Sequence, residues 1–134
     1  MKKYLLDTHT FIWAIAGKTK LSDVALRILQ ENDNQLFVSA VSLWEIAIKH
    51  GKGKLYLENF QIHEIPDYCR RLRIKQIPLT PEDAISYSDL PFYGSHKDPF
   101  DRMLVYQCIS GYYTLISKDD KMQIYANDGL ECIW

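Results

Sequence analysis

Four acidic residues of this chain stand at similar places relative to its apolar segments. Asp7 ends the run Tyr-Leu-Leu, Asp119 closes Leu-Ile-Ser-Lys, and Asp98 opens the segment that carries Asp101. Glu45 lies one turn into the helix-like segment Ser-Leu-Trp-Glu-Ile-Ala-Ile-Lys. In proteins of alternating strands and helices, ligand sites form beyond the carboxyl ends of the strands. Because Asp7, Asp98 and Asp119 are predicted there, we expect the acids Asp7, Glu45, Asp101 and Asp119 to meet at one edge of the sheet.

A cluster of carboxylates at such a place is typical of a binding site for a hard divalent cation. Two carboxylates about 4 Å apart repel by roughly 4 kcal/mol at an effective dielectric constant near 20, so four would raise one another's pKa values unless a cation compensates. Glu45 is surrounded by apolar residues in the sequence, where an uncompensated charge is costly. Carboxylate oxygens and water suit Mg²⁺ or Mn²⁺ rather than zinc. Lys49, one turn after Glu45, is a candidate counter-charge.

Each acid also has an ordinary structural explanation. Acidic residues and serines cap helix N-termini, and a Glu–Lys pair four residues apart forms an ion pair on a helix. These explanations apply to Asp7 or Thr8, to Ser42 with Glu45 and Lys49, to Asp98 with Asp101, and to Asp119 or Asp120. The occurrence of all the acids together favours the cation site, and the choice between Asp119 and Asp120 stays open.

The composition is that of an ordinary globular protein. The chain has 134 residues, of which 47% are hydrophobic and 25% charged, and we expect one domain over residues 1–134. Asp7 breaks the first apolar stretch at once, and no run approaches the ~20 apolar residues of a membrane span, which predicts a cytoplasmic protein without a membrane partner. The three scattered cysteines favour reduced thiols over disulfides or a zinc site.

The net charge of −1 excludes a strongly basic surface, so any nucleic acid must contact a local patch. The histidines near the acids, His9, His50 and His96, share no ligand-type spacing, and we interpret them as surface or packing residues. Basic residues close to the acids in the sequence are the candidates for contacts with RNA phosphates: Lys52, Lys97, Arg102 and Lys118.

Hydrophobic periodicity and capping signals predict an alternating order of elements. Predicted strands cover residues 3–6, 36–38, 74–79, 114–116 and 130–134. Predicted helices cover residues 8–16, 23–32, 42–49, 62–73, 81–90, 99–109 and 119–126. Strands separated by helices imply parallel pairing with helices on both faces of the sheet, which indicates the α/β class.

Four segments of the sequence resemble one family. They are YLLDTHTFIW, SAVSLWEIAIKHGKGKL, HKDPFDRMLVYQC and LISKDDKMQIY, in this order between residues 4 and 125. Together they resemble the PIN domain family, and within it the VapC-like toxins of toxin–antitoxin pairs. The resemblance implies a three-layer α/β/α fold with a central, mainly parallel sheet of about five strands.

The resemblance also implies a function, that of a Mg²⁺- or Mn²⁺-dependent endoribonuclease that hydrolyses RNA phosphodiester bonds. An RNA substrate, a cognate antitoxin protein and a homodimer are the partners it implies. The acids of the family correspond to Asp7, Glu45, Asp101 and Asp119, with Asp98 as a further candidate ligand. The residues expected to support them are Thr8, Ser117 and Lys49.

Two other functions stay open at this point. Asp7 follows a predicted strand, as in phosphatases that use an aspartate nucleophile, although His9 stands where such enzymes usually carry a second acid. A metal-stabilised module that binds RNA or protein without catalysis is the non-enzymatic alternative.

Overall fold

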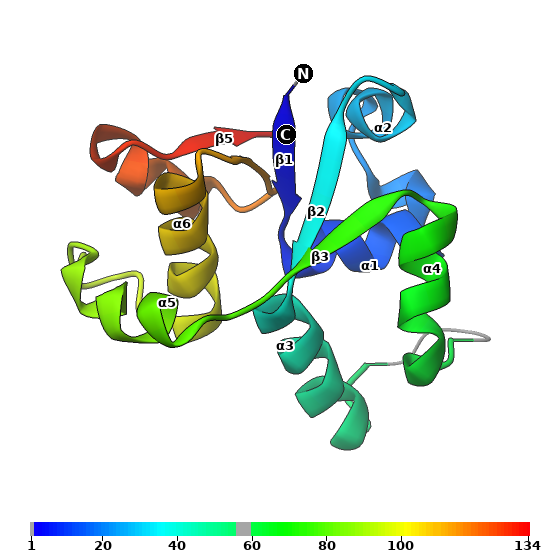
Figure 1. Ribbon diagram of the computed structural model, residues 1–134, viewed down its shortest axis with the longest axis horizontal. Helices are drawn as coiled ribbons and strands as arrows, with labels where there is room; N and C mark the ends of the chain where they lie inside the picture. Colours follow the sequence, from blue (N-terminus) through cyan, green and yellow to red (C-terminus); the bar gives the residue numbers. More distant parts are fainter. Residues whose placement is uncertain (1, 56–59) are drawn as a thin grey trace.

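A parallel sheet of five strands forms the centre of the molecule. The computed structural model describes residues 2–55 and 60–134. All strand pairs are parallel, and the strand order is β3-β2-β1-β4-β5, with β1 in the middle (Figure 1). The strands are β1 (Lys3–Leu6), β2 (Gln35–Ser39), β3 (Ile74–Ile77), β4 (Thr114–Ile116) and β5 (Glu131–Ile133).

Helices cover both faces of this sheet. In Figure 1, α1, α2 and α4 lie to one side of the strands, and α5 and α6 lie to the other. The α-helices are α1 (Thr8–Ala16), α2 (Asp23–Gln30), α3 (Ala40–Gly51), α4 (Ile65–Arg71), α5 (Pro81–Ser86) and α6 (Pro99–Gly111). Shorter 3-10 segments are η1 (Lys18–Lys20), η2 (Ile62–Glu64), η3 (Tyr87–Asp89) and η4 (Asp120–Asp128).

The central strand divides the hydrophobic core into two parts. Tyr4 and Leu6 pack in one cluster with residues of α1, α2 and α4, whereas Leu5 packs in the other with residues of α6 and η4. This division follows from the two-residue period of a strand, which points alternate side chains to opposite faces. The fold is therefore an α/β/α sandwich with a parallel sheet, and the predicted fold class is confirmed.

Several element boundaries differ from the prediction for local reasons. Helix α3 begins at Ala40 because Ser39 is its N-cap and accepts a hydrogen bond from the Val41 amide at 3.1 Å. Ser42 and Glu45 therefore lie inside the helix, and the capping-box interpretation was wrong. Strand β3 ends before Pro78, which has no N–H for the ladder.

Two predicted helices divide into shorter pieces, and a third is of another type. Residues 62–73 form η2 and α4, residues 81–90 form α5 and η3, and the last predicted helix is the 3-10 segment η4. None of the helices in the described ranges combines the length and the hydropathy that crossing a membrane requires.

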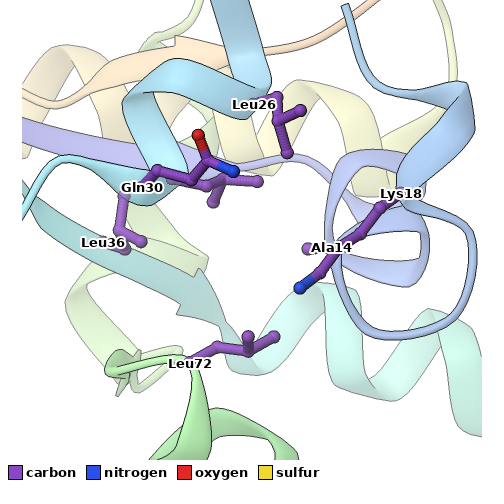
Figure 2. Close-up of a pocket in the computed structure, with 7 residues that line it drawn as sticks. Ala14, Lys18, Leu26, Gln30, Leu36 and Leu72 are labelled. Carbon is purple, nitrogen blue, oxygen red and sulfur yellow. The ribbon is translucent and has the colours of Figure 1, made fainter.

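A small cavity of about 60 Å³ lies between α1, α2 and the residue after α4 (Figure 2). Leu26, Leu36 and Leu72 point toward it, and Lys18 extends into it. None of the described residues that line it is acidic. Because Leu36 belongs to the amino-terminal half of β2, this cavity lies away from the carboxyl ends of the strands. The acids that follow the strands therefore lie away from this cavity.

The two-part core predicts where a truncation is costly. Leu5→Ala should lower the free energy of unfolding by about 2–5 kcal/mol, because Leu5 is fully buried between the sheet and α6. Ile85→Ala on α5 is the control: Ile85 is 77% exposed, and the change should stay within about 0.5 kcal/mol. Urea unfolding followed by circular dichroism measures both. Equal losses for the two variants would contradict the assigned core.

Candidate metal centre

The central strands deliver the acids to one edge of the sheet. Asp7 follows β1 directly, and Asp119 stands three residues after β4, which pairs with β1. Glu45 comes from α3, which begins directly after β2, the other neighbour of β1. Asp101 lies in the first turn of α6. Asp98, in contrast, follows η3 and a connecting segment rather than a strand, so its predicted place at a strand end was wrong.

Asp7 is buried and held by the start of α1. Its Oδ1 accepts a hydrogen bond from the Thr10 amide at 2.8 Å, which makes Asp7 the N-cap of the helix. The Thr10 hydroxyl donates to the Ile116 carbonyl oxygen at 2.9 Å and so ties α1 to β4. The capping role and a place in the cation site are thus compatible, because the cap fixes the carboxylate beside the end of β4.

Glu45 is also buried, and both of its carboxylate oxygens have partners. The Thr8 hydroxyl donates to Oε1 at 2.7 Å, and the Lys49 ammonium lies 3.0 Å from Oε2. The Ser42 hydroxyl lies 3.0 Å from that of Thr8. Thr8 and Lys49 therefore stand where the sequence places supporting residues, one on α1 and one on α3.

The pKa of Asp101 shows that the acids lie close enough to interact. Burial raises this pKa first, and the charges of Asp98, Glu45, Asp7 and Asp119 raise it further, to about 7. Each of the other acids therefore acts on Asp101 through space. Without a cation the Asp101 carboxyl group is about half protonated near neutral pH.

Asp119 rather than Asp120 faces the other acids. One ligand atom each from Asp119, Asp101 and His96 lie within 4.8 Å of one another. Asp119 is the N-cap of η4, with Oδ1 accepting from the Lys121 amide at 3.0 Å. Its own amide donates to the Ser117 hydroxyl at 3.1 Å, so Ser117 supports the turn that carries Asp119.

His96 is a site residue that the sequence interpretation missed. Its ring is buried, with Nδ1 2.7 Å from the Tyr125 hydroxyl and Nε2 3.7 Å from Asp101 Oδ2. Among the described residues, Nε2 has no hydrogen-bond partner. No spacing rule relates His96 to the acids, because it stands on a connecting segment. Its occurrence in the segment HKDPFD, just before two acids, was the available signal.

Asp98 contributes charge and a cap. Its Oδ1 accepts hydrogen bonds from the Phe100 amide at 2.8 Å and the Asp101 amide at 3.3 Å, and it is the N-cap of α6. Among the acids, Asp98 makes the largest contribution to the raised pKa of Asp101. The Asp98 residue is exposed. Its role as a direct ligand of the cation stays a prediction.

An open cavity of about 330 Å³ adjoins the acids. Its lining includes Asp7, Asp119, Lys118, His9 and Trp13. The Lys118 ammonium lies 5.9 Å from the centre of the Trp13 ring, within the range of a cation–π contact. The Lys118 ammonium and the Trp13 ring thus lie in the same open cavity as Asp7 and Asp119.

Three of the four predicted RNA-contacting residues are exposed, and the fourth is not. Lys52, Lys97 and Lys118 face solvent. Arg102 is only 4% exposed, and the prediction that it contacts RNA was wrong. Its guanidinium donates inside the protein to the Tyr87 and Tyr125 hydroxyls and to the carbonyl oxygens of residues 90 and 91. Its side chain is therefore part of the core around α6.

The donor set fits a divalent cation. Carboxylate oxygens dominate the set, and burial together with repulsion from the neighbouring carboxylates raises the pKa of Asp101 to about 7. A doubly charged ion would relieve that repulsion. Carboxylates of this kind, without thiolates, match Mg²⁺ or Mn²⁺ better than zinc.

The comparisons with known proteins agree with the fold. The family model described as the PIN domain matches residues 4–128, so the chain belongs to the PIN domain family. This confirms the family to which the four sequence segments pointed.

Among known proteins, the chain is similar to Ribonuclease VapC22 of Mycobacterium tuberculosis (strain ATCC 25618 / H37Rv). The two are 26% identical over 136 residues, which cover 100% of each. Three solved structures share the fold. VapBC from Salmonella typhimurium bound to DNA has a TM-score of 0.67 at 20% identity, covering 99% of this chain and 98% of that one. VapBC2 from Rickettsia felis bound to a promoter fragment has a TM-score of 0.65 at 18% identity, covering 98% of this chain and 97% of that one. FitAcB from Neisseria gonorrhoeae has a TM-score of 0.64 at 15% identity, covering 98% of this chain and 96% of that one.

The raised pKa of Asp101 predicts a pH dependence of stability. In the unfolded chain this carboxyl group titrates near the ordinary value of about 3.9. Between pH ~4 and the folded-state pKa of about 7, the folded protein holds a proton that the unfolded chain has released. The contribution of Asp101 to stability is therefore fully present below pH ~4 and is lost as the pH rises through 7.

Comparison with Asp101→Asn isolates this contribution. Without divalent cations, the free energy of unfolding of the variant, relative to that of the wild type, should increase as the pH rises from 4 to 7. Saturating Mg²⁺ should reverse the trend for the wild type only, because the cation binds the ionised carboxylate. Urea unfolding at several pH values, with EDTA or Mg²⁺, measures the difference. A difference independent of pH would show that Asp101 titrates normally.

Proposed function

We propose that this protein is a divalent-cation-dependent endoribonuclease of the VapC type, the toxin of a toxin–antitoxin pair. The observation that carries the proposal is the gathering of acids at the carboxyl edge of the sheet, where ligand atoms of Asp101 and Asp119 lie within 4.8 Å of each other. Burial, followed by the charges of Asp98, Glu45, Asp7 and Asp119, raises the pKa of Asp101 to about 7 at this place. Membership of the PIN domain family and the likeness to Ribonuclease VapC22 support the same activity. RNA is the proposed substrate.

The proposed cation ligands are Asp7, Glu45, Asp101 and Asp119, and the proposed cation is Mg²⁺ or Mn²⁺. When bound, such an ion would neutralise charge that develops on the scissile phosphate and lower the pKa of an attacking water. The helix cap holds Asp7, and Thr8 with Lys49 holds Glu45, so these carboxylates need little rearrangement. Asp7 or Asp101 is the proposed acceptor of the proton of the water.

Basic residues around the acids are proposed to bind the flanking phosphates of the RNA. Lys118 is the best placed, because it lines the same cavity as Asp7 and Asp119. Trp13 offers an aromatic face there on which a base can stack. Lys52 and Lys97 are exposed and extend the proposed contact surface.

Removal of a ligand should abolish RNA cleavage while the fold persists. Asp7→Asn and Asp101→Asn should each lower the cleavage rate by more than about 100-fold, beyond the 10- to 100-fold typical of outer-shell changes around a metal. The control is Asp33→Asn, since Asp33 is exposed and precedes β2 at the opposite edge of the sheet. Cleavage of labelled single-stranded RNA with Mg²⁺, Mn²⁺ or EDTA measures the rates.

Two results would contradict the proposal. Undiminished cleavage by both variants, after removal of contaminating nucleases, would refute the assigned acids, and cleavage that survives EDTA would refute the cation. Release of phosphate from a phosphomonoester without RNA cleavage would favour the aspartate-nucleophile phosphatase instead.

An antitoxin and a second copy of the chain are the proposed protein partners. The solved complexes of similar fold are named VapBC, which supports a partner protein for this chain as well. The acidic edge is the proposed place where the antitoxin blocks the site.

For the homodimer, the supporting observation is an apolar groove of about 270 Å³. Trp44 at its rim is 58% exposed and packs against Phe100 with ring centres 5.2 Å apart. The groove is lined by Val41, Trp44, Leu79, Ala84, Tyr87, Pro99, Phe100 and Met103.

The homodimer predicts a mass of twice the 15.7 kDa of one chain for the purified protein. Trp44→Ala should weaken association by roughly 30-fold, the effect of losing an aromatic hot spot of about 2 kcal/mol. Tyr112→Ala is the control, because Tyr112 is exposed but lies after the far end of α6. Sedimentation equilibrium over a range of concentrations measures both. A wild type that stays monomeric at every concentration would refute the homodimer.

A further inference from the structure

We propose that His96 is a positioning residue of the acidic site. Its Nε2–H donates a hydrogen bond to the Asp101 carboxylate and fixes the orientation in which that carboxylate meets the cation. This inference rests on the proposed function and adds to it a residue outside the four acids.

The first observation is a pair of groups that lack partners and face each other. Among the described residues, His96 Nε2 has no hydrogen-bond partner although the ring is 4% exposed. Asp7, Glu45 and Asp119 each accept hydrogen bonds or lie in an ion pair, whereas the described residues provide no such hydrogen bond to the Asp101 carboxylate. Nε2 and Asp101 Oδ2 are 3.7 Å apart. A buried polar atom is costly without a partner, so His96 Nε2 as donor and Asp101 Oδ2 as acceptor are complementary.

The second observation determines which ring nitrogen carries the hydrogen. Arg102 Nη1 donates to the Tyr125 hydroxyl oxygen at 3.0 Å, and a guanidinium can only donate. Among the described residues, the remaining partner of this hydroxyl is His96 Nδ1 at 2.7 Å. If Nδ1 donated to the hydroxyl, the hydrogen of the buried phenol would be left without an acceptor. The hydroxyl therefore donates to Nδ1, and the hydrogen of the neutral imidazole resides on Nε2.

The protonation states agree with this chain of hydrogen bonds. Burial raises the pKa of Tyr125, so the phenol keeps its hydrogen at neutral pH. Because Nδ1 accepts from this phenol, the His96 ring is the neutral imidazole. The direction of donation is then Arg102 to Tyr125 to His96 to Asp101.

The distance of 3.7 Å is longer than a formed hydrogen bond. Hydrogen bonds at active sites are often long in the absence of ligands and tighten in the complex. Carboxylates that bind metals are themselves held by hydrogen bonds from the surrounding residues. We therefore expect the Nε2–Asp101 contact to close when a cation orients the carboxylate.

Direct ligation by His96 is the main alternative. Ligand atoms of His96, Asp101 and Asp119 lie within 4.8 Å of one another, which leaves room for an ion. Ligation by Nε2 requires a lone pair on that atom, and hence the opposite tautomer. The tautomer thus distinguishes the positioning role from the ligand role.

Nitrogen NMR reads the tautomer without any measurement of activity. In a long-range ¹H–¹⁵N spectrum of the whole protein at neutral pH, the His96 ring should show a protonated Nε2 and an unprotonated Nδ1. Addition of Mg²⁺ should leave Nε2 protonated. A protonated Nδ1, or loss of the Nε2 hydrogen on binding Mg²⁺, would overturn the proposal. Because no RNA is involved, this result stands apart from the success or failure of the proposed ribonuclease.

A matched pair of variants then tests the hydrogen bond. His96→Gln keeps an N–H donor near the position of Nε2, whereas the shorter amide of His96→Asn reaches only the position of Nδ1, where its oxygen can accept from Tyr125. We expect His96→Asn to weaken Mg²⁺ binding, measured by calorimetry, and to lower kcat by roughly 10- to 100-fold. His96→Gln should recover most of both. Equal losses in two folded variants, or full function of His96→Asn, would refute the positioning role.

Discussion

Repulsion among carboxylates on a rigid frame is the constraint on which this site depends. Three of the acids have local partners for their carboxylates. Asp7 and Asp119 each accept a hydrogen bond from a backbone amide, and Glu45 accepts one from a hydroxyl and forms an ion pair with a lysine. Asp101 is partly buried and is repelled by all three and by Asp98, and these effects, burial first, raise its pKa to about 7. The Asp101 carboxyl group can therefore take up a proton near neutral pH, and binding of a cation would displace that proton.

The strand order explains why the acids meet at this place. Strand β1 lies between β2 and β4, so the chain leaves β1 toward one neighbour and returns later on the other side. In parallel sheets such a reversal opens a crevice beyond the carboxyl ends of the strands. Asp7 follows β1 and Asp119 follows β4, on either side of that crevice, and α3 brings Glu45 from the end of β2. The helix caps then set the direction of each carboxylate.

Much of this arrangement was predictable, because it depends on local signals. Alternation of apolar strands and amphipathic helices indicated the parallel sheet, and the position of Asp7 after a strand indicated its place at the edge. Contacts between distant segments left no such signal. The burial of Arg102 depends on hydroxyls from Tyr87 and Tyr125, which come from elements far along the chain. The part played by His96 depends on the same contacts.

Arg102 illustrates how the segment DPFDR serves two purposes. Asp98 caps α6, Asp101 faces the other acids, and Arg102, one residue later, points into the core. No carboxylate of the described residues pairs with this guanidinium, and an apolar side chain of similar volume could fill the same space. What an apolar side chain cannot provide is a fixed direction of donation. By donating to Tyr125, Arg102 leaves the phenol hydrogen for His96 Nδ1, and so keeps the imidazole hydrogen on Nε2, the nitrogen that lies 3.7 Å from Asp101.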